Sequence, residues 1–365
     1  ARGEIIGRNN QPLLFLILLI SLSWEEETVS SYTVIFGSDP SRSVGQIIRS
    51  WSCDDVLSRL FVIFGLGDMS NFGRRAVYLS VRCFHVGRVQ HASPRKQIGV
   101  LGMPLAHGQR KAGVEEGPKF LRNAGILDRL RELGHEVHDT GDVAIDGLPN
   151  ARDGKVLENS LVGATARNIC DAVQNIVSEG KICLTLGGDH SCAIGTIAGH
   201  AAATHSDVAV IWVDAHADLN TAKSTNSGNM HGMPVSFLVH EMESFTTKPN
   251  GLEWVRPCVH KENFAYIALR DVDTYERYFI DHVGITCYSM DDIDRYGIRQ
   301  VVQRAVRKVN PTGSKQLHVS FDIDAVDEQI ARSTGTPGKV IDASILLTLR
   351  NGEDAGTQEQ TSRDQ

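Results

Sequence analysis

Three side chains that can bind metal stand at every second position in the segment 214–218, namely Asp214, His216 and Asp218. In an extended backbone alternate residues point to the same side, so two carboxylates and an imidazole can converge on one point. This ligand set suits a hard or borderline divalent ion such as Mn²⁺ better than a thiolate-loving one. The spacing predicts a metal site, and the alternative is an ordinary polar loop after a strand.

Two further segments repeat this placement. The apolar run 181–186 leads into Gly-Gly-Asp-His-Ser, which contains His190, and the run 317–321 leads into Asp322 and Asp324. The segment 214–218 itself follows the apolar run 208–213, which is typical of a strand buried on both faces. Ligands bind at the carboxyl edge of open parallel sheets, so the three runs together favour a shared metal site there.

These motifs resemble the ureohydrolases, through GGDHS (187–191), DAHADLN (214–220) and SFDIDAVD (320–327). The segments SGNMHGMPVSFL (227–238), ALRDVD (268–273) and GVEEGPKFLRNAG (113–125) are similar to the arginase family in particular. The resemblance extends from about Gln97 to Pro337. It implies hydrolysis of L-arginine to L-ornithine and urea by a hydroxide that bridges two Mn²⁺ ions in each subunit.

The implied chemistry explains why a pair of ions is needed. A guanidinium carbon is a poor electrophile, and bound metal lowers the pKa of water from 15.7 to roughly 7. The resemblance gives one ion to His190, Asp214, Asp218 and Asp322. It gives the other to Asp214, His216, Asp322 and Asp324, so that Asp214 and Asp322 bridge. The sequence leaves Fe²⁺ and Co²⁺ open as alternatives to Mn²⁺.

The resemblance also implies roles around the metals. His231 is expected to be catalytic together with Asp218, delivering a proton to the leaving amine, a task that suits an imidazole. Asp189 is expected to be a loop cap or a partner of a ligand. The residues implied for substrate binding are Asn220, Ser227 and Asn229 for the α-carboxylate, Asp273 and Glu276 for the α-amino group, and Thr336 along the substrate. Agmatine lacks the α-carboxylate, so this set favours arginine.

The elements that must position these residues alternate along the chain. Strands are expected at 97–102, 136–142, 181–186, 208–213, 264–269 and 317–321. Helices are expected over 117–133, 161–177, after His190 and over 298–309, with a loop over 146–155. This alternation predicts an α/β fold with three α-β-α layers and a mostly parallel central sheet, like that of arginases.

Composition excludes several classes of protein. The hydrophobic fraction of 41% is ordinary for a globular chain, and the net charge of −7 gives no nucleic-acid footprint. Seven cysteines without a C-x-x-C motif argue against a disulfide framework and fit a reducing compartment. The apolar run 13–20 is short for a membrane span, so no stable span is expected.

Residues 1–96 lie outside the resemblance and are expected to form a largely unstructured extension. No acidic residue lies between Met69 and Glu115, and the basic, Ser-containing stretch 69–96 resembles a mitochondrial transit peptide. We hypothesise that Met69 is the physiological start and that residues 1–68 have no folded role. The alternative is a solvated arm on a cytoplasmic protein.

After Pro337 the resemblance stops. The catalytic domain is therefore expected to span 97–345 and to be incomplete or divergent at its C-terminal end, with a disordered tail over 346–365. The family continues with another strand and a glutamate that holds the guanidinium. Their absence would expose a sheet edge, weaken substrate binding and put the family's trimer in doubt. Two alternatives follow, an agmatinase-like ureohydrolase and a catalytically impaired metal-binding pseudoenzyme.

Overall fold

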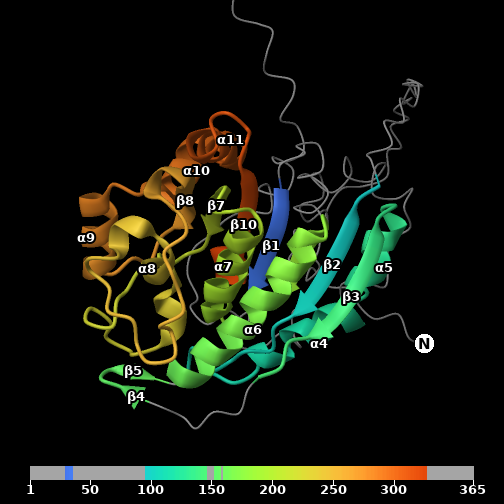
Figure 1. The fold of residues 1–365 in the computed structure, drawn as a ribbon. Helices are drawn as coiled ribbons and strands as arrows, with labels where there is room; N and C mark the ends of the chain where they lie inside the picture. Colours follow the sequence, from blue (N-terminus) through green and yellow to red (C-terminus); the bar gives the residue numbers. More distant parts are fainter. Residues whose placement is uncertain (1–28, 36–94, 146–151, 158, 327–365) are drawn as a thin grey trace, which may run out of the picture.

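The computed structural model describes residues 29–35, 95–145, 152–157 and 159–326. Within them, eight strands form one sheet in the order β3-β2-β6-β1-β10-β7-β8-β9, and every neighbouring pair is parallel (Figure 1). The strands are β1 (Val29–Ile35), β2 (Gln97–Gly102), β3 (Glu136–Asp142), β6 (Ile182–Leu186), β7 (Val208–Val213), β8 (Phe264–Leu269), β9 (Thr286–Ser289) and β10 (Gln316–Asp322). The predicted parallel α/β fold is confirmed.

Helices cover both faces of this sheet. Strand residues alternate between the two apolar cores: Ala209 and Ile211 of β7 pack on one face, whereas Val210 and Trp212 pack on the other. The first face is covered by α4 (Gly117–Asn123), α5 (Ile126–Glu132), α10 (Met290–Tyr296) and α11 (Ile298–Val309). The second is covered by α6 (Asn159–Ser178), α7 (Ala193–Ala203), α8 (Pro234–Leu238) and α9 (Thr274–Val283). Figure 1 shows α6 and α7 lying across this second face.

Two local predictions differ from the structure. The helix expected over 117–133 is divided into α4 and α5, because Gly125 adopts a left-handed conformation with φ of 86° between them. The end of the loop expected over 146–155 contains part of a short antiparallel hairpin, β4 (Arg152–Asp153) with β5 (Val156–Leu157). Neither difference moves a strand that carries a candidate site residue.

The least expected element is β1. Residues 1–68 were assigned no folded role, and for residues 29–35 this is wrong, because they form a strand between β6 and β10. The strand β10 is not a sheet edge, because it pairs with β1 on one side and β7 on the other. Among the described strands the sheet edges are β3 and β9. The transit-like stretch up to residue 94, Thr336 and the tail 346–365 lie outside the described residues.

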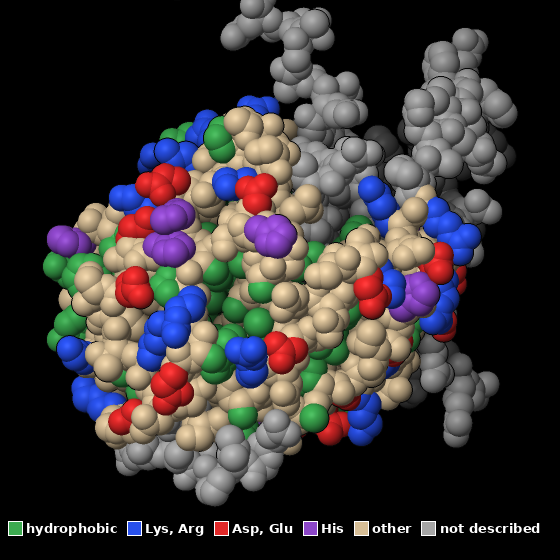
Figure 2. All heavy atoms as spheres, viewed as in Figure 1, with side chains coloured by type: hydrophobic (Ala, Val, Ile, Leu, Met, Phe, Trp, Pro, Cys, Tyr) green, Lys and Arg blue, Asp and Glu red, His purple; other side chains and the backbone are tan. Residues whose placement is uncertain are grey.

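Charged side chains of both signs are mixed on one face of the protein. On the face shown in Figure 2, acidic and basic side chains are interspersed and do not form a large patch of one sign. In the part of the chain that the structure describes, no helix combines the length and the apolar character needed to cross a membrane.

Two histidines are buried together between α7 and β10. His200 and His318 are both 0% exposed, and their Nδ1 atoms lie 3.1 Å apart, so one ring donates and the other accepts. Burial lowers the pKa of His200 from 6.5 to about 3. Burial, and then the neighbouring His200, lower the pKa of His318 well below its usual range. Both rings are therefore neutral in the folded protein at neutral pH.

The buried pair of His200 and His318 is expected to make the folded protein less stable in acid. Unfolded histidines bind protons below pH 6.5, whereas folded His200 resists protonation until about pH 3 and the pKa of His318 also lies well below its usual range. The contribution of this pair to the free energy of unfolding is therefore largest above pH 6.5. It decreases towards pH 3, by up to about 1.4 kcal/mol per pH unit for each histidine. Urea denaturation at a series of pH values measures this slope. His200→Gln should flatten it, whereas His205→Gln, at an exposed histidine, should not. Equal slopes in the two variants would contradict the assignment.

Candidate metal centre

The loop after β7 turns three predicted ligands towards one place. Asp214 Oδ1 accepts from the backbone N–H of His216 at 2.8 Å, and its Oδ2 accepts from Trp212 Nε1 at 3.0 Å. Asp218 has a φ of 47°, in the left-handed region that few residues other than glycine adopt but that Asp tolerates. Its carbonyl accepts from Val235 N at 3.1 Å, which holds the loop against the start of α8. The convergence therefore uses a turn, not a fully extended segment.

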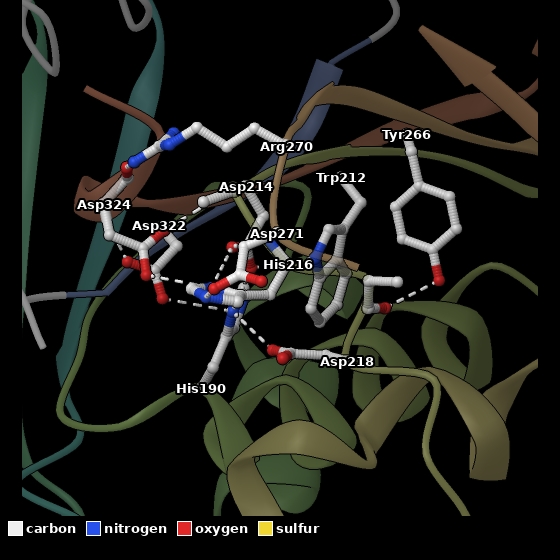
Figure 3. Close-up of polar contacts among 12 residues, drawn as sticks. His190, Trp212, Asp214, His216, Asp218, Tyr266, Arg270, Asp271, Asp322 and Asp324 are labelled. Carbon is white, nitrogen blue, oxygen red and sulfur yellow. Dashed lines mark hydrogen bonds and ion pairs between the residues drawn. The ribbon is translucent and has the colours of Figure 1, made fainter. Parts of the chain in front are cut away.

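His190 lies in the 3₁₀ turn η2 (His190–Cys192), directly after β6, and is 1% exposed. Its Nε2 is 2.9 Å from Ser320 Oγ, and its ring stacks on Trp212 with centroids 4.1 Å apart. Its Nδ1 lies 2.9 Å from Asp214 Oδ2, 3.1 Å from Asp218 Oδ2 and 3.4 Å from Asp322 Oδ2. The contacts with Ser320 and Trp212 fix the orientation of the imidazole (Figure 3).

The surroundings of His190 Nδ1 fit a divalent ion. Three carboxylate oxygens approach this nitrogen, yet within the described residues none is aligned to form a hydrogen bond with it. Ligand atoms that converge on an ion adopt this arrangement, since they point at a common centre and not at one another. Ligand atoms of His190, Asp214 and Asp218 all lie within 4.8 Å of one another.

A second group of ligands shares Asp214 with the first. His216 Nδ1 lies 3.1 Å from Asp324 Oδ2 and 3.4 Å from Asp214 Oδ1. Asp322 Oδ1 accepts from the N–H of Asp324 at 2.9 Å, which orders the turn after β10. Arg270 donates to the carbonyl of Asp324 from the loop after β8. Figure 3 shows these acidic and imidazole side chains converging from separate loops. The two candidate ligand groups thus have Asp214 in common.

The electrostatics of this cluster favour bound cations. Burial, followed by Asp322 and Asp214, raises the pKa of Asp324 to about 7. Burial and the charge of Asp214 raise the pKa of Asp218 well above its usual range. Burial opposes protonation of His216, but Asp214 and Asp324 outweigh it and raise the pKa of His216 to about 12. Carboxylates so crowded and so little solvated need positive charge, which protons or metal ions can supply.

His231 lies in η3 (Met230–Gly232), beside the loop that follows β2. Its backbone N–H donates to Gly108 O at 2.9 Å. Burial lowers the pKa of His231, while the carboxylates of Asp189 and Asp322 act in the opposite direction. Asp189 caps η2 by accepting from Ser191 N at 2.9 Å, and it also accepts from Gly108 N at 2.8 Å. The expectation that Asp189 is a loop cap is confirmed.

Three of the predicted substrate residues are tied together. Asn220 Nδ2 donates to Asp273 Oδ2 at 2.7 Å. Asp273 and Glu276 form a capping box at the start of α9, in which Asp273 Oδ1 accepts from Glu276 N and Glu276 Oε2 accepts from Asp273 N. Glu276 Oε1 also accepts from Leu219 N at 3.1 Å, and burial and Asp273 raise its pKa to about 7. These contacts join the loop after β7 to α9.

Ser227 and Asn229 lie together on a neighbouring loop. Ser227 is exposed, and its Oγ accepts from Asn229 N at 3.2 Å. The side-chain oxygen of Asn229 is buried without a hydrogen-bond partner among the described residues. The oxygen and nitrogen of an amide can be exchanged by a flip, so this atom marks one end of the amide that is free for a ligand. Thr336 lies outside the described residues.

Several residues of the site were not singled out from the sequence. They are Trp212, Ser320, Arg270 and Asp271. Trp212 stacks on His190 and donates to Asp214. Asp271 is exposed, and its Oδ2 lies 3.7 Å from His216 Nε2. Trp212 and Ser320 stand two positions before Asp214 and Asp322. The every-second-residue rule that found the ligands therefore also places these two residues on the ligand face of the sheet.

Comparison with known proteins agrees with this architecture. The chain is 44% identical to "Arginase, hepatic" of Aquarana catesbeiana over 67% of this chain and 75% of the relative. It is 43% identical to "Arginase-2, mitochondrial" of Rattus norvegicus over 66% of this chain and 68% of the relative. Among solved structures, arginase of Entamoeba histolytica in complex with L-ornithine is 28% identical over 67% of this chain and 81% of the other, with a TM-score of 0.60. The sequence profile of the Arginase family matches residues 96–340, and the chain belongs to this family.

Proposed function

We propose that this protein hydrolyses L-arginine to L-ornithine and urea at a centre that holds two Mn²⁺ ions. The observation that carries the proposal is the pair of ligand groups, His190 with Asp214 and Asp218, and His216 with Asp214 and Asp324. The relatives named arginase support the reaction, and the relative solved with L-ornithine supports an amino-acid product. The oxygen and imidazole donors suit Mn²⁺.

Such a pair of ions, when bound, lowers the pKa of water and so supplies the nucleophile for hydrolysis. The protein's own residues then have three tasks. The buried carboxylates and imidazoles would hold the ions, with Asp214 a member of both ligand groups. Trp212 and Ser320 hold the ring of His190 in one orientation. His231 delivers a proton to the departing amine, a task that suits an imidazole, which accepts and releases protons near neutral pH.

Substrate selection falls to the loops around the metal centre. Asn220, Ser227 and Asn229 hold the α-carboxylate. The Asn229 amide supports this role, because its Oδ1 has no hydrogen-bond partner among the described residues and a flip would place the NH₂ donor there. Asp273 and Glu276 receive the α-amino group in addition to capping α9. An amino acid would thus be held at both α-groups while its guanidinium faces the metals.

The proposal is tested by measuring urea and ornithine from the purified chain after incubation with Mn²⁺, together with the metal content. Two bound ions per chain and turnover of arginine support it. Turnover of agmatine in preference to arginine would transfer the chain to another ureohydrolase activity. Two bound ions with no turnover of either substrate would establish the metal-binding pseudoenzyme.

Asn229→Ala is expected to raise KM for arginine roughly 10- to 100-fold with little change in kcat. A hydrogen bond to a charged group contributes about 1.5–3 kcal/mol, and this one would form equally in the ground and transition states. Steady-state kinetics on arginine and agmatine measure the effect, which should be absent for agmatine. Asn226→Ala, at an exposed asparagine of the same loop, is the control. An unchanged KM for Asn229→Ala would remove Asn229 from the carboxylate site.

The site of action in the cell is also part of the proposal. We infer a mitochondrial protein from the basic, acid-free stretch 69–96 and from the relative named as mitochondrial. Localisation of the chain with and without residues 69–96 tests this, and an unchanged distribution would contradict it.

A further inference from the structure

The strand β1 lies between two strands that both lead into the metal centre. It pairs with β6 through Ser31–Cys183 and Val34–Leu186, and with β10 through Thr33–Ser320 and Ile35–Asp322. Both pairings are parallel, and Figure 1 shows β1 in the middle of the sheet. In the described sheet β6 and β10 form no pairs with each other, since β1 separates them along their length.

The ligands from β6 and β10 meet across the end of β1. His190 follows β6, and its two ring nitrogens lie 2.9 Å from Ser320 Oγ and 3.4 Å from Asp322 Oδ2, both on β10. Neighbouring strands lie about 4.8 Å apart, so one inserted strand sets a separation of about 9–10 Å between β6 and β10. Without it these strands would face each other with unpaired N–H and C=O groups, or would close up and shift the ligands.

We propose that Val29–Ile35 is a positioning strand of the metal centre: by completing the sheet it sets the separation of β6 and β10 at which His190 and Asp322 face the same ion. The segment contributes through its backbone pairing and does not touch the reacting atoms. The inference rests on the proposed metal centre for its metal-binding readout, whereas its sheet-pairing readouts are independent of it.

The first experiment replaces one residue of β1 in the full chain. Thr33→Pro removes a backbone donor from a strand paired on both sides, and Thr33→Val keeps both the donor and a β-branched side chain. Thr33→Pro should weaken Mn²⁺ binding at least tenfold, measured by equilibrium dialysis on the monodisperse fraction. It should also speed amide hydrogen exchange in β6 and β10 at least tenfold in metal-free protein. Thr33→Val should stay within about twofold in both. Wild-type metal affinity and wild-type exchange in Thr33→Pro would overturn the proposal.

A second experiment tests the pairing without disturbing it. Ser31 pairs with the native Cys183 in the backbone register, and the Cα atoms of neighbouring strands lie within the distance that a disulfide spans, so Ser31→Cys can form this bond, whereas Ser30→Cys is one residue out of register. Because burial raises the pKa of Cys183 to about 12, the proteins are refolded in a glutathione redox buffer, which gives the thiols access to each other before burial. Peptide mapping should find the 31–183 disulfide in the first variant and not the corresponding 30–183 disulfide in the control.

The two experiments separate the inference from the proposed function. A 31–183 disulfide and accelerated exchange in Thr33→Pro, with no Mn²⁺ bound by the wild type, would support β1 as the separating strand and reject the metal centre. A folded wild type that binds Mn²⁺, together with no 31–183 disulfide in refolded Ser31→Cys, would support the metal centre and overturn the role of β1.

Discussion

Asp214→Asn is expected to lower kcat/KM for arginine on the order of 10³-fold, equivalent to about 4 kcal/mol, and to reduce the bound metal below two ions per chain. Asp214 is the residue common to both ligand groups, is 1% exposed, and meets His190 through one oxygen and His216 through the other. An amide keeps the size of the side chain but removes the negative charge that two cations would share. Activity and metal content are measured on the same preparation.

Asp271→Asn provides the matched control for this change. The Asp271 carboxylate lies 3.7 Å from His216 Nε2, but its side chain is 78% exposed, and solvent screens such a pair to between 0 and about 1 kcal/mol. Its kcat/KM should therefore remain within about fivefold of the wild type, with both ions bound. Comparable losses in the two variants would mean that general negative charge near the site, and not ligation by Asp214, supports activity.

The sequence was sufficient to predict the strands that carry the ligands. The runs that became β6, β7 and β10 are continuously apolar and end in polar residues, which is a strong local signal for buried parallel strands. The convergence of Asp214, His216 and Asp218 was predicted from alternation in an extended backbone. The structure brings them together by a turn with Asp218 in the left-handed region, a conformation that alternation does not predict.

Asp273 and Glu276 show how one pattern can have two uses. An acidic residue followed three positions later by Glu is a signature of a helix start, and α9 begins with this capping box. The resemblance implied only substrate binding for this pair, whereas the local sequence also indicates the helix start.

The position of β1 could not be derived from local sequence. Its residues VSSYTVI carry no motif, and its partners in β6 and β10 lie far along the chain. The pairing of strands so far apart in the sequence depends on which strands in the assembled sheet still have unpaired edges. The local sequence of a single segment does not contain this information. The resemblance, which begins near Gln97, offered no guide to a segment that precedes it.

Removal of metal is expected to lower Tm by roughly 10 °C. An ion present at about 1,000 times its Kd stabilises the folded state by about 4 kcal/mol, and each kcal/mol shifts Tm by about 2–4 °C in a domain of 150–250 residues. Bound metal is expected to stabilise the folded state because the carboxylates lie close together and are buried. Burial and mutual repulsion already raise the pKa of Asp218 and Asp324 without bound cations. Calorimetry of the Mn²⁺-loaded protein before and after exhaustive dialysis against a chelator measures the difference.

The same two variants make this measurement decisive. Asp214→Asn should show little further decrease of Tm on chelation, because its metal is already weakly held, whereas Asp271→Asn should retain the full decrease. Readdition of Mn²⁺ should restore Tm in the wild type and in Asp271→Asn, and Mg²⁺ at the same concentration should restore less, since imidazole ligands favour Mn²⁺ over the harder ion. A wild type that carries two ions yet keeps its Tm after losing them would show that the cluster is stable without cations, contrary to the electrostatics of Asp214 and its neighbours.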